Sequence, residues 1–240
     1  GLLFYFKYLI FFAGNVAAAS TWVGLDWSAP EWKIILPLGI SFYTFQTISY
    51  TVDVYRRVIE PERDFLLYAN YVTFFPQLVA GPILRASEVI AQLTRRPRFC
   101  LEDVGTGVRR IVFGLFLKVV LADNIAPLVD NAYSQATESL SALDVWTLAF
   151  LFGFQIYFDF SAYSHIALGA ARVMGIRFPE NFDFPYIASS PREFWRRWHI
   201  SLSSWIRDYL YLPLAREPFR VHSTGGLEVA AGSSAAGSSV

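Results

Sequence analysis

The stretch VWTLAFLFGFQIYFDF at residues 145–160 is apolar at almost every position, and its only charged residue is Asp159. A helix needs about 20 apolar residues to cross a bilayer, and apolar character continues past this stretch far enough to reach that length. Of the 240 residues in the chain, 54% are hydrophobic and only 17% are charged, whereas soluble domains have roughly 25% charged residues. We therefore predict an all-α polytopic membrane protein.

Three more stretches are candidates for membrane helices, at residues 2–23, 34–54 and 108–122. The last is the shortest and contains Lys118. Because an ammonium group is costly to bury in lipid, we expect this long side chain to reach the membrane surface from near the end of its helix.

Residues 65–84 are also long enough to cross a membrane, but Pro76, Gly81 and Pro82 interrupt the second half of the stretch. Arginines flank it on both sides, and the positive-inside rule places such flanks in the cytoplasm. We therefore predict a re-entrant or interfacial segment with both ends on one side. Such a segment is tolerated only if surrounding protein covers its broken backbone.

The distribution of charge predicts which loops lie on which side of the membrane. Residues 123–144 contain Asp and Glu but no Lys or Arg, which is typical of an external loop. Basic residues return between Arg172 and Arg207. This second region should therefore lie on or near the cytoplasmic side.

A helix should begin at Ser190, where an S-x-x-E capping box ends on Glu193 and Pro191 occupies the first helical position. We expect this helix to continue until Pro213 closes it. One face would carry an aromatic and apolar stripe at three- and four-residue steps. The stripe consists of Trp195, Trp198, Leu202, Trp205 and Tyr209, and a neighbouring face carries Arg196, His199 and Ser203.

His199 distinguishes a chemical role for this helix from simple anchoring at the membrane surface. An interfacial helix with indoles and arginines needs no chemistry, but it gains nothing from an imidazole. A neutral imidazole can act as an acid, a base or an activating group near pH 7. Asp208 lies nine residues further on, too far along one helix to bond His199 directly. Arg207 is free to pair with a carboxylate elsewhere or with an anionic acyl donor.

Other polar residues give weaker signals. Ser161 and His165 have i, i+4 spacing, but no G-x-S-x-G elbow accompanies them, and a structural role is the simpler interpretation. Asp159 is harder to explain structurally, because an unpaired carboxylate in an apolar run is expensive, so it is a candidate for a polar network or substrate path. Asn181 and Asp183 are typical of loops and turns, and Asn181 is retained as a candidate tunnel residue.

Composition excludes several classes of site. The formal net charge is zero, which gives no global attraction to nucleic acid. With three dispersed histidines and one cysteine, no metal site is predicted. Residues 229–240 read VAAGSSAAGSSV, a tract that should not order itself. We interpret residues 215–240 as a disordered or frameshifted tail.

Several long strings carry a resemblance to a known family. They are LPLGISFYTFQTISYTVDVYR from Leu36, FFPQLVAGPILR from Phe74, GLFLKVVLADNIAP from Gly114, YFDFSAYSHIALGAARVMGIRFPENFDFPY from Tyr157 and FWRRWHISLSSWIRDYLYLPL from Phe194. Together they resemble the membrane-bound O-acyltransferases, and within them the bacterial branch that O-acetylates alginate. Residues 1–214 would then form part of such a domain.

The resemblance implies a ring of membrane helices around a thinned centre in a multi-pass protein of the bacterial inner membrane. The expected substrates are an acyl donor, such as acetyl-CoA or an acyl carrier protein, and a polysaccharide acceptor or a periplasmic acetyltransferase that receives the acetyl group. No bound cofactor is expected.

The resemblance also assigns site residues. His199 matches the histidine of a W-H-x-S-L-S motif, while Arg207 and Asp208 match its R-D pair. Trp198, Asn181 and Asp159 are further candidates for the tunnel. The principal catalytic histidine of the family belongs to a later W-H-G motif that residues 215–240 do not contain. We therefore expect His199 to support catalysis, and the chain as given to be inactive.

Two other interpretations remain open on the sequence. Asp159, Arg207 and Asp208 would line a translocation path if the protein were a polytopic transporter or flippase. The chain would alternatively be a non-catalytic fragment that only inserts into the membrane. The sequence does not identify the acceptor polymer, the acyl donor or the oligomeric state.

Overall fold

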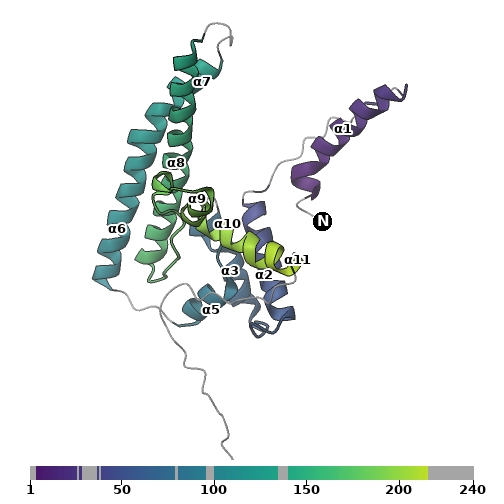
Figure 1. Cartoon of the computed structure of the whole chain (residues 1–240). Coiled ribbons are helices and arrows are strands. Elements are labelled where there is room, and N and C mark those ends of the chain that lie inside the picture. Colours follow the sequence, from purple (N-terminus) through teal and green to yellow (C-terminus); the bar gives the residue numbers. More distant parts are fainter. Residues whose placement is uncertain are drawn as a thin grey trace, which may run out of the picture.

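The computed structural model describes residues 4–25, 27–28, 37, 39–78, 81–95, 100–134 and 140–215. These residues form helices and connecting loops, as predicted (Figure 1). The tail predicted at residues 215–240 lies outside the described residues, apart from Ala215.

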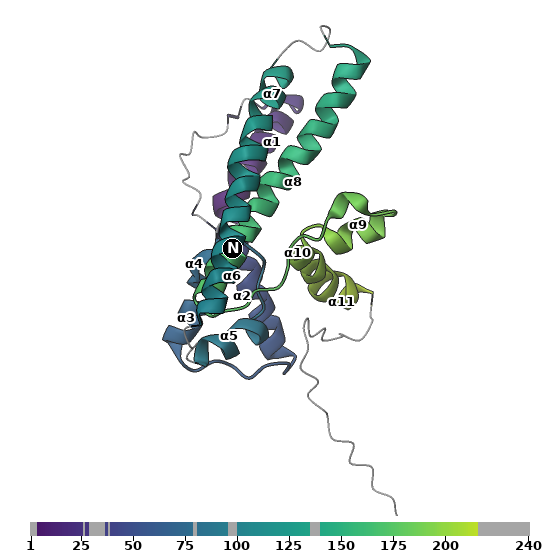
Figure 2. The same ribbon diagram turned by 90° about the vertical axis from the view of Figure 1, so that its left-hand side faces the viewer.

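Two long helical elements form an antiparallel hairpin (Figures 1 and 2). The first is the continuous run of α6 (Leu101–Leu115), η2 (Phe116–Ala122) and α7 (Asp123–Tyr133), and the second is α8 (Ala142–Val173). At 33 and 32 residues, both are long and apolar enough to cross a membrane. The stretches predicted at residues 108–122 and from residue 145 onward therefore lie in helices that are long enough to be membrane spans.

The hairpin corrects two predictions about its acidic end. The loop predicted at residues 123–144 is largely helical, because helix continues to Tyr133 and α8 already begins at Ala142. Its placement on the external side stays a prediction. Asp144 in this stretch caps the start of α8. It completes a capping box with Ser141, and its carboxylate accepts the Ser141 backbone N–H at 3.0 Å. Lys118 does not lie near a helix end. It sits in the middle of the 33-residue run and pairs with Asp123 and Asp159 at 2.8 and 2.6 Å.

Small residues allow the two backbones of the hairpin to touch. A Cβ atom added to Gly107 would lie 2.6 Å from the carbonyl oxygen of Gly169, and one added to Gly169 would meet the carbonyl of Gly107 at the same distance. Two turns further along α6, a Cβ on Gly114 would lie 2.8 Å from the carbonyl oxygen of Ala162. Small residues at such crossings are the usual means of close packing between membrane helices.

The N-terminal half contains the helices predicted there, as far as its residues are described. Within residues 2–23 lie η1 (Phe4–Tyr8) and α1 (Leu9–Trp22), and the stretch predicted at residues 34–54 contains α2 (Ile40–Tyr55). Gly39 precedes α2 with φ of 73°, and a side chain there would clash with the Leu78 carbonyl oxygen 2.6 Å away. Neither helix is among the described ones that are long and apolar enough to cross a membrane.

The interrupted segment at residues 65–84 is broken, as predicted, into α3 (Phe65–Thr73) and α4 (Phe75–Leu78), and the non-helical residues 81–85 lead to α5 (Ala86–Thr94). Protein covers the break: Tyr71 and Leu84 are fully buried, and the Tyr71 hydroxyl donates to the Leu84 carbonyl at 3.0 Å. Gln77 Nε2 donates to the Tyr71 carbonyl at 2.7 Å. These side chains satisfy backbone groups that an unbroken helix would have paired.

The helix predicted from Ser190 to Pro213 is instead interrupted once. Its first part is α9 (Pro191–Arg197), preceded by η4 (Pro185–Ile187), and its second part is the continuous run of α10 (Ile200–Trp205), η5 (Ile206–Tyr211) and α11 (Leu212–Leu214). The start is confirmed, because the Glu193 N–H donates to Ser190 Oγ at 3.2 Å. The helix ends at Leu214, one residue after the predicted end at Pro213.

The break falls at Trp198 and His199, and its cause is pairing with a distant segment. The N–H of Ile200 donates to the Asn181 carbonyl at 2.9 Å, and the N–H of Asp183 donates to the Arg197 carbonyl at 2.9 Å. The predicted continuous stripe is therefore wrong. Trp198 packs near Phe182, whereas Trp205 packs on Phe45 of α2.

Candidate functional site

His199 occupies the break between α9 and α10 in a left-handed backbone conformation, with φ of 41°. This conformation is uncommon outside glycine and asparagine, and it recurs at functional sites. The side chain is 7% exposed. Its ring meets Phe160 of α8 edge to face at 4.8 Å and lies roughly parallel to Phe182 at 6.3 Å.

Asn181 and Ser201 are the polar neighbours of the imidazole. His199 Nδ1 lies 3.1 Å from Asn181 Oδ1 and 3.4 Å from Ser201 Oγ. The same Asn181 oxygen accepts hydrogen bonds from the Ser201 N–H at 3.2 Å and the Ser201 hydroxyl at 2.9 Å. Ser201 Oγ in turn accepts from the N–H of Ile83 at 3.0 Å. The network thus ties α10 to the broken segment at residues 65–84.

Burial lowers the pKa of His199 to about 4. The imidazole is therefore neutral near pH 7 and retains a lone pair on one ring nitrogen. That is the protonation state required of a base or a hydrogen-bond acceptor.

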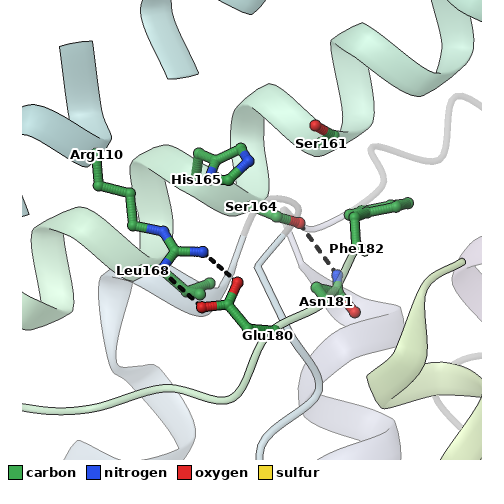
Figure 3. A pocket seen from close by; sticks show the side chains of 8 residues that line it. All are labelled: Arg110, Ser161, Ser164, His165, Leu168, Glu180, Asn181 and Phe182. Atoms are coloured by element: carbon green, nitrogen blue, oxygen red, sulfur yellow. Dashed lines mark hydrogen bonds and ion pairs between the residues drawn. The ribbon is translucent and has the colours of Figure 1, made fainter. Parts of the chain in front are cut away.

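Asn181 also attaches the site to the hairpin. Its Nδ2 donates to Ser164 Oγ of α8 at 3.1 Å, and Figure 3 shows the amide directed at this hydroxyl. The neighbouring Glu180 forms an ion pair with Arg110 of α6. The interpretation of Asn181 as an ordinary loop residue is wrong, because the side chain is 1% exposed and bridges two elements.

Asp208 forms a second polar cluster. It is fully buried and accepts from Arg207 Nε at 2.7 Å and from Arg85 Nη2. Burial by itself would raise the pKa of Asp208, but the hydrogen bonds from the two arginines outweigh it and hold the pKa below its usual value. The carboxylate therefore stays ionised and fixes both guanidinium groups.

Both clusters border one cavity of about 530 Å³, within the size range of small-molecule sites. Its wall is mixed in character, with apolar groups between hydroxyl and charged side chains. The polar part of the lining consists of Arg85, Arg207, Glu88, Glu180, Ser201 and Ser204. A molecule in this cavity would contact the arginine pair and Ser201, which is hydrogen-bonded to Asn181 beside His199.

The structure separates the predicted site residues into groups. His199 and Asn181 are in contact, Arg207 and Asp208 are in contact, and the two pairs meet at the cavity through Ser201 and Arg207. Trp198 packs against aromatic rings beside His199. Asp159 does not join this site in the described part of the chain, and it forms an ion pair with Lys118 at 2.6 Å.

Sequence reasoning missed Arg85 and Ser201. Arg85 is the charged residue that ends the otherwise apolar stretch FFPQLVAGPILR, and that isolation was an available signal. Ser201 gave no such signal, because a serine within a helical stretch more often bonds the carbonyl of its own helix.

Comparison with known proteins shows the family. A family model described as MBOAT, membrane-bound O-acyltransferase family, matches residues 61–227. The probable alginate O-acetylase AlgI of Pseudomonas syringae pv. tomato is 43% identical over 213 residues, covering 89% of this chain and 40% of the relative. The peptidoglycan O-acetyltransferase of Helicobacter pylori is 38% identical and covers 89% of this chain and 44% of the relative.

A more distant relative is the teichoic acid D-alanyltransferase of Streptococcus thermophilus, which is 33% identical over 187 residues. The chain spans 40% to 44% of the length of these three curated relatives. The family match nevertheless covers more than half of the chain, including the hairpin, the broken segment and both polar clusters. The chain therefore belongs to the membrane-bound O-acyltransferase family.

Proposed function

We propose that this chain is part of a membrane O-acyltransferase that moves an acetyl group across the bacterial inner membrane for O-acetylation of an alginate-like exopolysaccharide. The observation that carries this proposal is the buried, neutral His199, whose neighbour Ser201 lines a cavity that also presents two arginines. An anchoring helix has no use for this arrangement, whereas acyl transfer needs a neutral acid-base group next to a bound substrate.

The residues divide the work in this proposal. His199 supports the reaction by orienting the acyl donor or the acceptor hydroxyl, and does not itself form the covalent centre. Arg85 and Arg207 line the cavity together with Glu88 and Glu180, and the buried Asp208 behind them fixes the guanidinium pair that would hold an acetyl-CoA or acyl-carrier donor. Trp198 and Asn181 shape the tunnel around His199. Asp159 would contribute to a polar path only through Lys118.

The membrane placement follows the same reasoning. The α6–α8 hairpin would cross the bilayer as part of a ring of helices, and the broken segment at residues 65–84 would enter from the cytoplasmic side beneath it. Its flanking arginines and the basic residues between Arg172 and Arg207 support this orientation. The acceptor, a polysaccharide or a periplasmic acetyltransferase, would approach from the opposite side.

Replacement of the histidine that aligns with His199 in a full-length relative tests the role. Asparagine is the right substitute, because it tolerates the left-handed backbone and removes the imidazole. We expect His199→Asn to reduce acetyl transfer at least 10-fold while the protein still inserts into the membrane. Arg196→Gln, on the exposed part of α9, is the matched control and should retain activity.

Two outcomes would contradict the proposal. Unchanged acetylation and donor binding in His199→Asn would remove His199 from the reaction. Export of polysaccharide by reconstituted vesicles without any acetylated product would identify a transporter instead.

A further inference from the structure

Asn181 has an orientation that its surroundings determine. The backbone N–H of Ser201 can only donate, so the Asn181 atom that it meets at 3.2 Å must be the carbonyl oxygen Oδ1. The amide nitrogen then faces Ser164 Oγ at 3.1 Å, where it has an acceptor. A flipped amide would place two donors against each other beside Ser201.

This orientation determines the proton on His199. Because Asn181 Oδ1 is an acceptor 3.1 Å from His199 Nδ1, an unprotonated Nδ1 would set two lone pairs against each other. Ser201 Oγ does not change this result. Its proton is directed at Asn181 Oδ1 at 2.9 Å, so the oxygen offers Nδ1 a further acceptor at 3.4 Å.

We propose that Asn181 is a positioning residue that holds His199 in the tautomer with the proton on Nδ1, which leaves Nε2 as the nitrogen that meets the substrate. Among the described residues, Nε2 has no hydrogen-bond partner of its own. Asn181 acts through His199 and needs no contact with substrate. It is anchored in turn by Ser164 of the hairpin and by Ser201, which the Ile83 N–H holds in place.

This inference rests on the proposed function only where it says that Nε2 meets a substrate. The tautomer can be measured without any activity, because the chain contains three histidines. Histidine labelled with ¹⁵N in the detergent-solubilised chain gives one set of ring signals for each. The single variants His165→Asn and His222→Asn each remove one set and assign the third to His199.

We expect the wild-type protein at pH 7 to show a protonated Nδ1 and an unprotonated Nε2 at His199. In Asn181→Leu, which keeps the branched shape of the side chain but removes the acceptor, both tautomers should be populated. Asn181→Asp should place a carboxylate against Nδ1–H and raise the pKa of His199 by about 1–3. Asn70→Asp, an identical change on the exposed face of α3, is the control and should leave the titration unchanged.

The groups around His199 make this titration interpretable. In the described part of the chain its ring faces Phe160, Phe182, Asn181 and Ser201, which carry no charge at any pH of interest. A change in the pKa of His199 in Asn181→Asp is therefore attributable to the new carboxylate. A protonated Nε2 in the wild-type protein would overturn the inference, even if every Asn181 variant failed to fold. Identical tautomer and titration in Asn181→Leu, Asn181→Asp and wild type would overturn it as well.

A parallel assay in a full-length relative separates this inference from the proposed function. If acetyl transfer depends on His199 Nε2, Asn181→Asp should move the acidic limb of the pH–rate profile upward by about 1–3 pH units. The predicted tautomer without any dependence of acetyl transfer on His199 would sustain the positioning role and refute the function. Acetyl transfer that depends on His199, with the proton found on Nε2, would support the function and refute the positioning role of Asn181.

Discussion

The α6–α8 hairpin and the site formed by residues 176–215 are stabilised by different interactions. In the hairpin, two long helices are in contact through Gly107 and Gly169, and hydrogen bonds between neighbouring turns stabilise each helix. In the site, the helical run that begins at Ile200 is fixed by partners far along the chain, such as the N–H of Ile83 on Ser201 and the indole of Trp205 on the Phe45 carbonyl. The contrast indicates that the hairpin is a scaffold, whereas the site depends on a few polar bonds that position His199.

The buried charge of Asp208 should produce the largest difference between the two regions. Asp208→Asn keeps the shape of the side chain but leaves Arg85 and Arg207 without their counter-charge. Removal of one partner of a buried ion pair costs about 3–5 kcal/mol. We expect the free energy of unfolding to fall by that amount in a denaturant titration in detergent. The site should lose its structure before the hairpin does.

Asp183→Asn is the matched control for this substitution. Its carboxylate is 59% exposed and pairs with Arg197 at 3.1 Å, and exposed pairs contribute less than about 1 kcal/mol. Equal losses for the two variants would show that Asp208 is not an electrostatic anchor of the site.

Acid should weaken the site through His199. Because burial lowers the pKa of His199 to about 4, the unfolded chain, with the ordinary histidine pKa of about 6.5, binds a proton more readily. The free energy that the neutral, buried His199 contributes to folding is fully present above about pH 6.5. It is lost as the pH falls toward 4, by roughly 3 kcal/mol in total.

Hydrogen exchange at the α10 amides between pH 7 and pH 4, corrected for intrinsic rates, measures this effect. In His199→Asn, which has no titrating ring at this position, the pH dependence of α10 should flatten. A slope that is the same in His199→Asn and wild type would assign the acid sensitivity to other groups.

The glycine contact should give the smallest of the three effects, confined to the hairpin. In Gly107→Ala the new Cβ would lie 2.6 Å from the Gly169 carbonyl oxygen, and such overpacking costs about 1–3 kcal/mol. Gly105→Ala, two residues earlier on the same helix, meets nothing within 4 Å. It should stabilise the helix by about 0.5–1 kcal/mol.

Unfolding in detergent, followed by circular dichroism, compares the two variants. Destabilisation by Gly107→Ala together with stabilisation by Gly105→Ala would confirm close backbone contact in the hairpin. Equal stabilisation by both variants would refute it. The tautomer of His199 should be unchanged in Gly105→Ala.

The sequence predicted those features that depend on neighbouring residues. The helical, membrane-spanning character of residues 145–160, the break caused by Pro76 and Gly81, and the helix start at Ser190 all follow from composition or spacing within a turn or two. The family resemblance pointed to His199, Arg207 and Asp208, although it did not reveal their surroundings.

The predictions that were wrong failed because hydrogen bonds and ion pairs with other segments changed the structure that local spacing favours. An uninterrupted helix through His199 is the best local arrangement, but the backbone bonds between residues 181–183 and 197–200 replace it. The acidic stretch after Lys118 resembled a loop until the structure showed its carboxylates capping a helix and pairing with Lys118.

The sequence by itself determined that this protein is helical, apolar enough for a membrane and carries its polar chemistry in one short segment. Only the tertiary structure decided which groups face that chemistry: Arg85 lies 123 residues from Asp208, and Asn181 lies 18 residues from His199. Helix formation depends on interactions within a few residues, whereas the partners of a buried polar group depend on which distant segments exclude water together.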